Sequence, residues 1–288
     1  MLKDQKQIMK NWKNFDKPLV SISCVTYNHQ DYIENTIKSF LIQETDFCFE
    51  ILITDDASAD KTVKIIKKYV DQYPDIIKPL FHQTNQFRKS SQPHIKNITR
   101  AQGEYIAFCD GDDFWSSHKK LSKQIAAMKE YNDCNVSFHG VKIHNLLTNE
   151  ISEKCPSKKI LIYKPWKIIL FGNKLYTSTV SIIIKKKIFF NIPYFYLNAP
   201  TEDYYILILG SLRKGALFIP DVMSVYRLFT PNSWHFDPNL SKHFYENFKC
   251  LFKFLLSLKI VQIYLFPVVI VKLIEFGIKS FILKFFYK

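Results

Sequence analysis

The first half of the 288-residue chain alternates short β-branched runs with segments that carry apolar residues at helical spacing. Strands are predicted at residues 19–27, 50–54, 76–81 and 104–109, and helices at residues 32–43, 61–73 and 93–102. Ser58 and Asp60 are suited to cap the second of these helices, which ends before Pro74. Strands that alternate with helices build βαβ units. The sequence therefore predicts an α/β fold, a Rossmann-like mixed sheet flanked by helices.

The rest of the chain is expected to complete one large body. A helix at 121–131 and strands at 136–143 and 179–184 follow the first half, and no Gly- or Pro-rich linker interrupts them. The six cysteines lack a CxxC pair or zinc-ligand spacing, which favours core thiols in a reducing compartment. The polar, lysine-rich residues 1–16 lack the apolar region of a signal peptide, so we expect a cytoplasmic protein.

Acidic or polar residues follow three of the predicted strands. Asn28 follows the first strand, Asp55 and Asp56 follow the second, and the cluster 110–113 (Asp-Gly-Asp-Asp) follows the fourth. In open α/β sheets such loops gather at the carboxyl edge, where ligands bind. Crowded carboxylates are costly without a cation, and Mn²⁺ or Mg²⁺ suits carboxylate oxygens and a diphosphate. An Asp-rich turn that caps the next helix is the structural alternative.

Three stretches, in order and spacing, resemble family 2 glycosyltransferases: residues 18–28 (PLVSISCVTYN), 55–60 (DDASAD) and 103–113 (GEYIAFCDGDD). The resemblance implies a GT-A fold and transfer of a sugar from a nucleotide diphosphate, with UDP as the default nucleotide. It implies nucleotide contacts from Thr26, Tyr27, Asp55, Asp56 and Asp110. In the DxD motif, Asp110 and Asp112 are the implied metal ligands, and Asp113 would orient the donor sugar or the surroundings of the metal.

The sequence departs from the family pattern at two positions. Where the family commonly carries Arg followed by Asn, this chain reads Pro93-His94-Ile95, so Arg88 or His94 would have to supply the phosphate contact; a solvated loop is the alternative. Residues 225–234 (VYRLFTPNSW) resemble the family's Tyr-Arg-x-His segment, with Phe229 in place of the His. Arg227 and Trp234 are then candidate donor contacts, with a structural salt bridge as the alternative for Arg227. His235 is a candidate replacement ligand, although a lone histidine beside Trp and Phe is more often a packed or surface residue.

A candidate general base follows about 90 residues after the DxD motif. Glu202 and Asp203 resemble the family's Glu-Asp motif at the start of an acceptor-side helix, which implies that Asp203 deprotonates the acceptor hydroxyl and that Glu202 lies near the donor sugar. One base opposite a metal-bound leaving group implies inversion at the anomeric carbon. Alternatively, Thr201 caps a helix whose dipole favours the two acids.

The C-terminal residues differ in composition from the rest. We divide the chain into a lead segment (1–17), a catalytic domain (18–240) and a cationic amphipathic tail (241–288). The longest uncharged stretch of the tail, 260–271, is too short to cross a bilayer. Two interfacial helices that break near Pro267, with lysines at anionic headgroups, are expected. The alternative is a helical pair packed on the catalytic domain or in a homodimer.

The net charge of +14 suggests an anionic partner, which could be nucleic acid, a phosphorylated substrate or an acidic lipid surface. A sugar-phosphate nucleotidyltransferase would need a Gly-rich basic loop after the first strand, and residues 27–30 (YNHQ) contain no glycine. A non-catalytic sugar-nucleotide binder or a basic nucleic-acid-binding protein is the other alternative, although no nucleic-acid-binding motif is recognisable. We therefore expect a nucleotide-sugar donor, a glycan or lipid-linked acceptor, an anionic membrane surface and no nucleic acid as partners.

Overall fold

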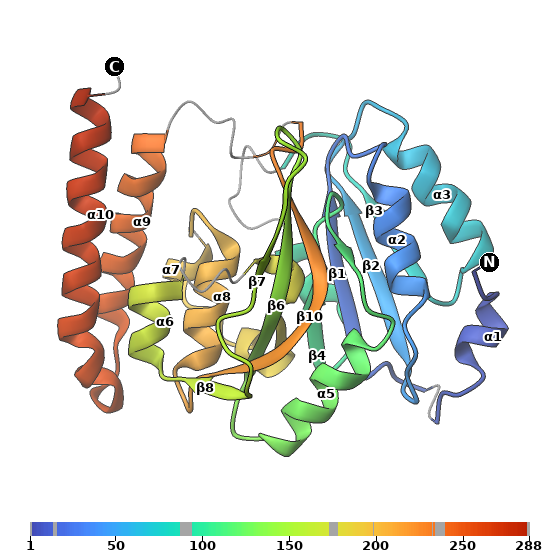
Figure 1. The fold of residues 1–288 in the computed structure, drawn as a ribbon, viewed down its shortest axis with the longest axis horizontal. Coiled ribbons are helices and arrows are strands. Elements are labelled where there is room, and N and C mark those ends of the chain that lie inside the picture. The colour runs from blue at the N-terminus through green and yellow to red at the C-terminus, as the bar shows by residue number, and fades with distance from the viewer. Residues whose placement is uncertain are drawn as a thin grey trace.

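The computed structural model describes residues 2–13, 16–86, 94–172, 178–197, 199–231, 233 and 240–286. Within these residues a ten-stranded mixed sheet forms the centre of the molecule (Figure 1). Its main path runs β3-β2-β1-β4-β9-β6-β10-β5, while β7 pairs with β6 and β8 pairs with β10. This arrangement confirms the predicted α/β class.

The first half of the chain builds the parallel side of the sheet. Strands β1, β2, β3 and β4 are parallel neighbours. The elements are α1 (Gln5–Met9), β1 (Val20–Thr26), α2 (Ile33–Leu41), β2 (Phe49–Asp55), α3 (Thr62–Gln72), β3 (Ile77–Phe81), α4 (Ile95–Arg100) and β4 (Tyr105–Phe108). The predicted strands and helices of this half are confirmed, mostly to within a residue or two at each end. Asp60 accepts the amide of Thr62 at the start of α3, as a capping residue does.

The second half adds strands that pair antiparallel, apart from the parallel pair of β6 and β10, together with the remaining helices. Its elements are β5 (Phe114–Trp115), α5 (Lys120–Glu130), β6 (Val136–Asn145), β7 (Ile151–Lys154), β8 (Leu161–Tyr163), α6 (Pro165–Phe171), η2 (Thr179–Ser181), β9 (Ile183–Lys185), η3 (Lys186–Phe189), α7 (Tyr194–Leu197), α8 (Glu202–Ser211), β10 (Ala216–Leu228), α9 (Leu240–Ser257), η5 (Ile260–Leu265) and α10 (Phe266–Phe286). The strand expected at 179–184 is instead a 3₁₀ turn followed by the short β9.

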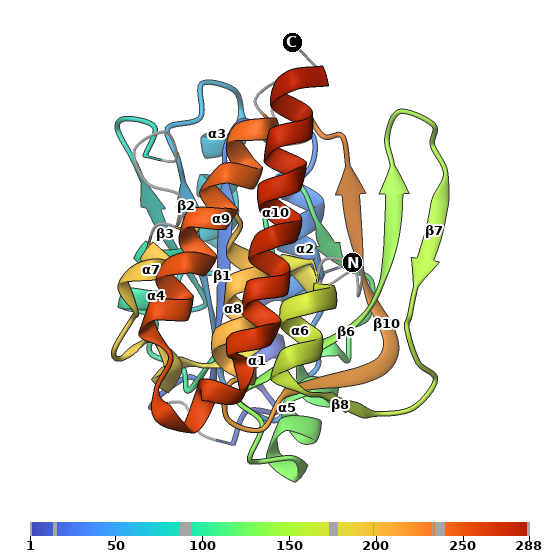
Figure 2. The same ribbon diagram turned by 90° about the vertical axis from the view of Figure 1, so that its left-hand side faces the viewer.

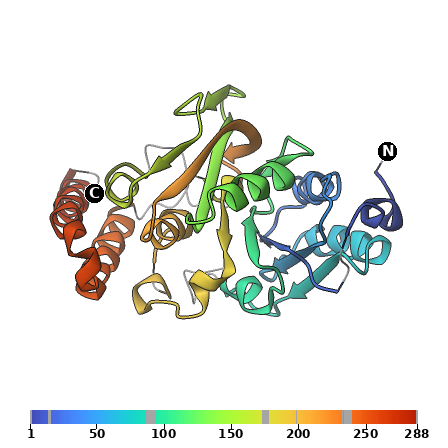
Figure 3. The ribbon, with the colours of Figure 1, turned by 90° about the horizontal axis from the view of Figure 1, so that it is seen from below.

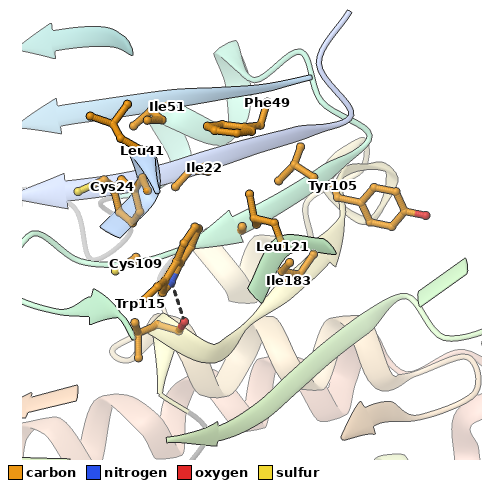
Figure 4. Close-up of a cluster of buried hydrophobic side chains, with 14 of the residues drawn as sticks. Ile22, Cys24, Leu41, Phe49, Ile51, Tyr105, Cys109, Trp115, Leu121 and Ile183 are labelled. Carbon is orange, nitrogen blue, oxygen red and sulfur yellow. Dashed lines mark hydrogen bonds between the residues drawn. The ribbon is translucent and has the colours of Figure 1, made fainter. Parts of the chain in front are cut away.

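The sheet is buried on both faces, so its strands alternate between two apolar cores. On β4, Tyr105 and Ala107 join one core, whereas Ile106 and Phe108 join the other. The first core lies under α1, α2, α3 and α5, and the indole of Trp115 points into it and donates to the carbonyl of Val180 at 3.2 Å (Figure 4). The second core lies under α4, α6, α7 and α8.

The C-terminal helices α9 and α10 pack on each other and on the second core. They stand at the end of the molecule opposite α1, outside α6, α7 and α8 (Figures 2 and 3). Leu251, Phe254, Val269 and Phe276 are buried there. Pro267 lies in the first turn of α10, where its missing N–H breaks no helical bond, so the break between the helices comes earlier, at 258–265. No helix of the described residues is long and apolar enough to span a membrane.

Candidate active site

The loops after β1, β2 and β4 meet at one edge of the sheet. The parallel register pairs Thr26 with Asp55 at the ends of β1 and β2. The amide of Gly111 donates to the carbonyl of Val25 at 2.8 Å. A Cβ atom on Gly111 would lie 2.5 Å from Thr26 Oγ1, so only glycine allows the β4 loop to approach β1 this closely. The three loops therefore form the carboxyl-edge surface that the sequence predicts.

Hydrogen bonds lock the loops after β1 and β2 together. The Asn28 amide donates to Ser58 Oγ, and the Asn28 side-chain oxygen accepts from the Ala59 amide, both at 2.8 Å. Asn28 has φ 54° and Ala57 has φ 64°, a left-handed conformation that asparagine tolerates well and alanine does not. This double contact fixes the backbone of Tyr27, whose side chain keeps partial exposure to solvent.

Three of the predicted nucleotide-binding residues have side chains that also hold these loops. Thr26 is buried, and its Oγ1 lies 3.2 Å from His29 Nδ1. The Asp55 carboxylate accepts the Ser58 amide at 3.0 Å, and burial raises the pKa of Asp55. Asp56 Oδ1 accepts the amide of Gln86 at 2.7 Å. Their nucleotide contacts stay predictions, while their structural contacts explain how the loops keep their shape.

The three aspartates of the acidic cluster after β4 differ in their exposure to solvent. The side chain of Asp110 is 34% exposed and that of Asp112 is 15% exposed, whereas Asp113 is buried. Asp113 Oδ1 accepts the amide of Arg227 at 2.8 Å, and its buried Oδ2 has no hydrogen-bond partner within the described ranges. Burial, with the charge of Asp112 adding to it, raises the pKa of Asp113 well above its usual range. Asp113 is therefore a buried carboxyl group that joins the motif to β10 through the amide of Arg227.

The end of β10 closes over the second aspartate of the motif. Thr230 Oγ1 donates to Asp112 Oδ2 at 2.6 Å, and the guanidinium of Arg227 donates to the Asp112 carbonyl. That guanidinium also lies over the rings of Tyr32, at 5.2 Å, and Phe114, at 4.6 Å. Arg227 thus holds the backbone of the motif, and Thr230 orients its carboxylate.

His94 lies at the start of α4, beneath the first aspartate of the motif. Its ring is 1% exposed; Nδ1 lies 2.7 Å from Ser23 Oγ and Nε2 lies 3.0 Å from Asp110 Oδ1. Burial opposes the charged ring, but the charges of Glu202 and Asp110 outweigh burial and raise the pKa of His94. The structure therefore places this residue on a carboxylate of the motif, whereas the sequence suggests a phosphate contact.

The acidic pair at the start of α8 faces the same region. Burial raises the pKa of Glu202 to about 7, and its Oε1 accepts the hydroxyl of Tyr196 at 3.0 Å. Burial also raises the pKa of Asp203 to about 6, and the nearby charge of Asp110 adds to the effect. Thr201 precedes the helix but its side chain makes no capping hydrogen bond. Two carboxyl groups whose pKa values lie near neutrality are suited to proton transfer.

A family model described as "Glycosyl transferase family 2" matches residues 21–197, a range that contains all three loops. The chain belongs to glycosyltransferase family 2. A glycosyltransferase of Haemophilus influenzae is 30% identical over 73% of this chain and 80% of its own length. An uncharacterized protein of Mycobacterium tuberculosis is 30% identical over 75% of this chain, and the match spans about 60% of the length of that relative.

The chain is also similar to a relative with a named role and to a protein of known structure. TuaG of Bacillus subtilis, named as a teichuronic acid biosynthesis glycosyltransferase, is 38% identical over 47% of this chain and 50% of its own. The crystal structure of S. aureus TarS 1-349 in complex with UDP-GlcNAc superposes with a TM-score of 0.66 at 19% identity, over 92% of this chain and 73% of TarS. At that identity the likeness establishes the fold, and the GT-A fold predicted for this family 2 glycosyltransferase is confirmed.

The DxD residues of this glycosyltransferase fit a divalent metal that the substrate helps to hold. In the described part of the chain, no three His, Cys, Asp or Glu side chains gather as a closed cation site. Mg²⁺ and Mn²⁺ accept carboxylate oxygens, and Mg²⁺ usually binds through one or two carboxylates with waters and substrate phosphates. Asp110 and Asp112 supply two such carboxylates, both partly exposed. This donor set suits a nucleotide-diphosphate complex better than a structural metal.

Some predicted site residues lie outside the described residues, and some residues of the site were not predicted. Arg88, Trp234 and His235 belong to the first group, so their predicted contacts stay predictions. Phe229 has φ 64°, and the next residue, Thr230, contacts Asp112; the sequence prediction missed Thr230 because a single threonine in a loop belongs to no recognisable motif. It also missed Ser23, although the alternation of Ser21 and Ser23 along β1 marks the strand face that meets α4.

Proposed function

We propose that the chain is an inverting, metal-dependent glycosyltransferase that moves a sugar from a nucleotide diphosphate, with UDP as the default nucleotide, onto a glycan or lipid-linked glycan in surface polysaccharide biosynthesis. The observation that carries this proposal is that His94 contacts both Asp110 of the DxD motif and Glu202, the neighbour of Asp203 at the start of α8. Structures of TarS bound to UDP and to UDP-GlcNAc, and the name of TuaG, support the donor and the pathway class.

The loops after β1 and β2 are the proposed nucleotide site. Tyr27 keeps partial exposure on a backbone that Asn28 and Ser58 clamp, which suits stacking of a base. Asp56 directly follows β2, and its carboxylate accepts one backbone amide. A preorganised loop lowers the entropy that donor binding would otherwise lose.

Asp110 and Asp112 are the proposed ligands for Mn²⁺ or Mg²⁺. The bound ion would supply positive charge to the departing diphosphate. Thr230 holds the Asp112 carboxylate, and Arg227 holds the Asp112 carbonyl, so the motif is oriented before any donor arrives. A Mn²⁺-bound mannosyltransferase from Pyrobaculum calidifontis has a similar fold, which supports the choice of metal.

Asp203 is the proposed general base. Its raised pKa keeps the carboxylate basic enough to accept a proton from an acceptor hydroxyl near pH 7. A base that activates the acceptor on the face opposite the leaving group produces inversion in a single displacement. Glu202 is engaged with Tyr196 and the amide of His94, so it is the less suitable base of the pair.

A screen of sugar nucleotides tests this function without knowledge of the acceptor. Each donor is incubated with the protein and Mn²⁺, and released nucleoside diphosphate is measured with and without a chelator. We expect slow hydrolysis of at least one donor that stops with the chelator and resumes with fresh Mn²⁺. If a folded preparation neither hydrolyses nor binds any sugar nucleotide of the panel, the proposal is wrong.

We further propose that the outer face of α9 and α10 docks on an anionic membrane. The inner face of this pair belongs to the core, yet a stripe of large apolar side chains stays exposed on α10, at Phe266, Ile270, Ile274, Ile278 and Phe281. Residues 240–288 contain eight Lys and two Glu, and of these lysines Lys272 is buried and pairs with Glu275, so it does not belong to the outer face. A second copy would bring like charges together, whereas anionic lipid complements them. Tail and catalytic body are then one unit, held at the surface where a lipid-linked acceptor resides.

Liposome sedimentation tests this face with a matched control. The double variant Ile274→Glu, Ile278→Glu changes the exposed stripe, and Leu147→Glu, Ile151→Glu makes the same change at exposed positions of the β6–β7 hairpin. We expect only the first to release the protein from vesicles with anionic lipid, and high salt to weaken the wild-type interaction. Equal sedimentation of both variants contradicts docking through α10. Loss of a dimer in the first variant would identify an interface between copies instead.

A further inference from the structure

His94 joins three segments that belong to different parts of the proposed site. Through Nδ1 it contacts Ser23 on β1, and through Nε2 it contacts Asp110 of the DxD motif. Its backbone amide donates to Glu202 Oε2 at 3.4 Å, next to Asp203 on α8. The ring meets Phe108 edge-on, with centroids 5.1 Å apart. One residue thus contacts the metal motif and the acceptor-side helix.

We propose that His94 is a positioning residue that fixes the carboxylate of Asp110 for donor and metal. This inference rests on the proposed glycosyltransferase function. A carboxylate attached to a loop rotates about two side-chain bonds, and a buried ring that holds one oxygen restricts that rotation. Because the ring holds one oxygen of the Asp110 carboxylate, the direction in which the second oxygen points is fixed as well.

Direct binding of a phosphate by the His94 ring does not fit the geometry. The side chain is almost completely buried, and both ring nitrogens already have partners within 3.0 Å. A phosphate oxygen could reach the ring only after one of these contacts broke.

Two conservative substitutions separate the two ring contacts. The amide nitrogen of glutamine takes a position close to that of Nε2, so His94→Gln keeps a donor toward Asp110 and loses the contact with Ser23. The amide of asparagine is closer to the position of Nδ1, so His94→Asn keeps the contact with Ser23 and loses the donor to Asp110. Both variants bury an amide of similar polarity, which makes them matched controls for each other.

The readout is Mn²⁺ binding, measured by the loss of the electron paramagnetic resonance signal of free Mn²⁺ in the presence of UDP. Groups that orient a metal ligand typically change metal affinity by about 10- to 100-fold when removed. We expect His94→Asn to weaken Mn²⁺ binding by about that factor and His94→Gln to stay within about threefold of wild type. Thermal unfolding midpoints of the two variants should be similar, because each loses one buried contact.

Equal loss of Mn²⁺ affinity in both variants, in step with equal loss of stability, overturns the inference and leaves His94 a packing residue. Wild-type affinity in both variants overturns it as well. These outcomes are distinct from failure of the proposed function, in which the wild-type protein itself binds neither Mn²⁺ with UDP nor any other nucleotide diphosphate. Should both variants fail to fold, Ser23→Ala, which removes only the partner of Nδ1, is expected to lower Mn²⁺ affinity through a looser ring; unchanged affinity there contradicts the inference.

Discussion

Replacement of Asp203 by asparagine should slow transfer strongly and stabilise the protein at the same time. Burial raises the pKa of Asp203 to about 6 in the folded chain, from an ordinary value of 3.8. At pH 7 the folded state therefore carries a carboxylate that it disfavours by roughly 3 kcal/mol at most, at about 1.4 kcal/mol per pKa unit. The residue keeps partial exposure, so we expect about 1–2 kcal/mol. Asparagine removes this cost.

The sign of the effect depends on pH. Because the folded pKa lies above the unfolded value, the cost is absent below about pH 3.8, grows as the pH rises toward 6, and is complete at pH 7. Thermal unfolding of wild type and Asp203→Asn should therefore give a higher midpoint for the variant at pH 7 and nearly equal midpoints at pH 4. Asp221→Asn, at a partly exposed position of β10 where the carboxylate pairs with Lys123, is the control and should not stabilise the protein.

The rate of sugar transfer should depend on pH through the ionisation of Asp203. With a pKa of about 6, roughly nine tenths of the base is ionised at pH 7 and about one tenth at pH 5, so transfer should fall about tenfold between them. Asp203→Asn should transfer about 10² times more slowly while it binds nucleotide as the wild type does. A wild-type rate that stays constant down to pH 4.5, or a variant that is both active and destabilised, would refute this reasoning.

Two further substitutions test the motif. Gly111→Ala should lower stability by about 1–3 kcal/mol in chemical denaturation, because its Cβ would lie 2.5 Å from Thr26 Oγ1, and a fully stable variant contradicts the close packing of the two loops. Phe229→His should strengthen Mn²⁺ binding measured by paramagnetic resonance, because residue 229 precedes the Asp112 contact at Thr230 and histidine tolerates the left-handed φ of 64° better than most side chains; unchanged binding would mean that this side chain does not reach the metal.

Local patterns explain which parts of the fold were predictable. Strands β1 to β4 are short apolar runs bounded by turns, so periodicity located them. Strand β10 was not predicted, because Pro220 and Asp221 interrupt it where its register with β6 shifts. The tail shows a different limit. Helix α10 is apolar on two faces, so its sequence does not tell which face is buried, and only the tertiary packing shows that Leu273 faces the core while Ile274 faces solvent.

The candidate site, like the fold, was predictable from the sequence only in part. The sequence identifies Asp110 and Asp112 because they directly follow a strand whose carboxyl end must lie at the ligand edge. It cannot identify the contact of His94 with Asp110, sixteen positions away, or the influence of Asp110 on Asp203, because both depend on how α4 and α8 pack on the sheet. The side chains that orient these carboxylates required the structure.

The most direct test of the central claim is a calorimetric titration of UDP into the wild-type protein and into Asp112→Ala, each with Mn²⁺ and with a chelator. The account predicts binding to the wild type that requires Mn²⁺ and is lost in Asp112→Ala, while the unfolding midpoint of the variant confirms that it is folded. Equal affinity of the two proteins for UDP in Mn²⁺, or wild-type binding that the chelator leaves unchanged, would contradict a metal-dependent donor site at the DxD motif.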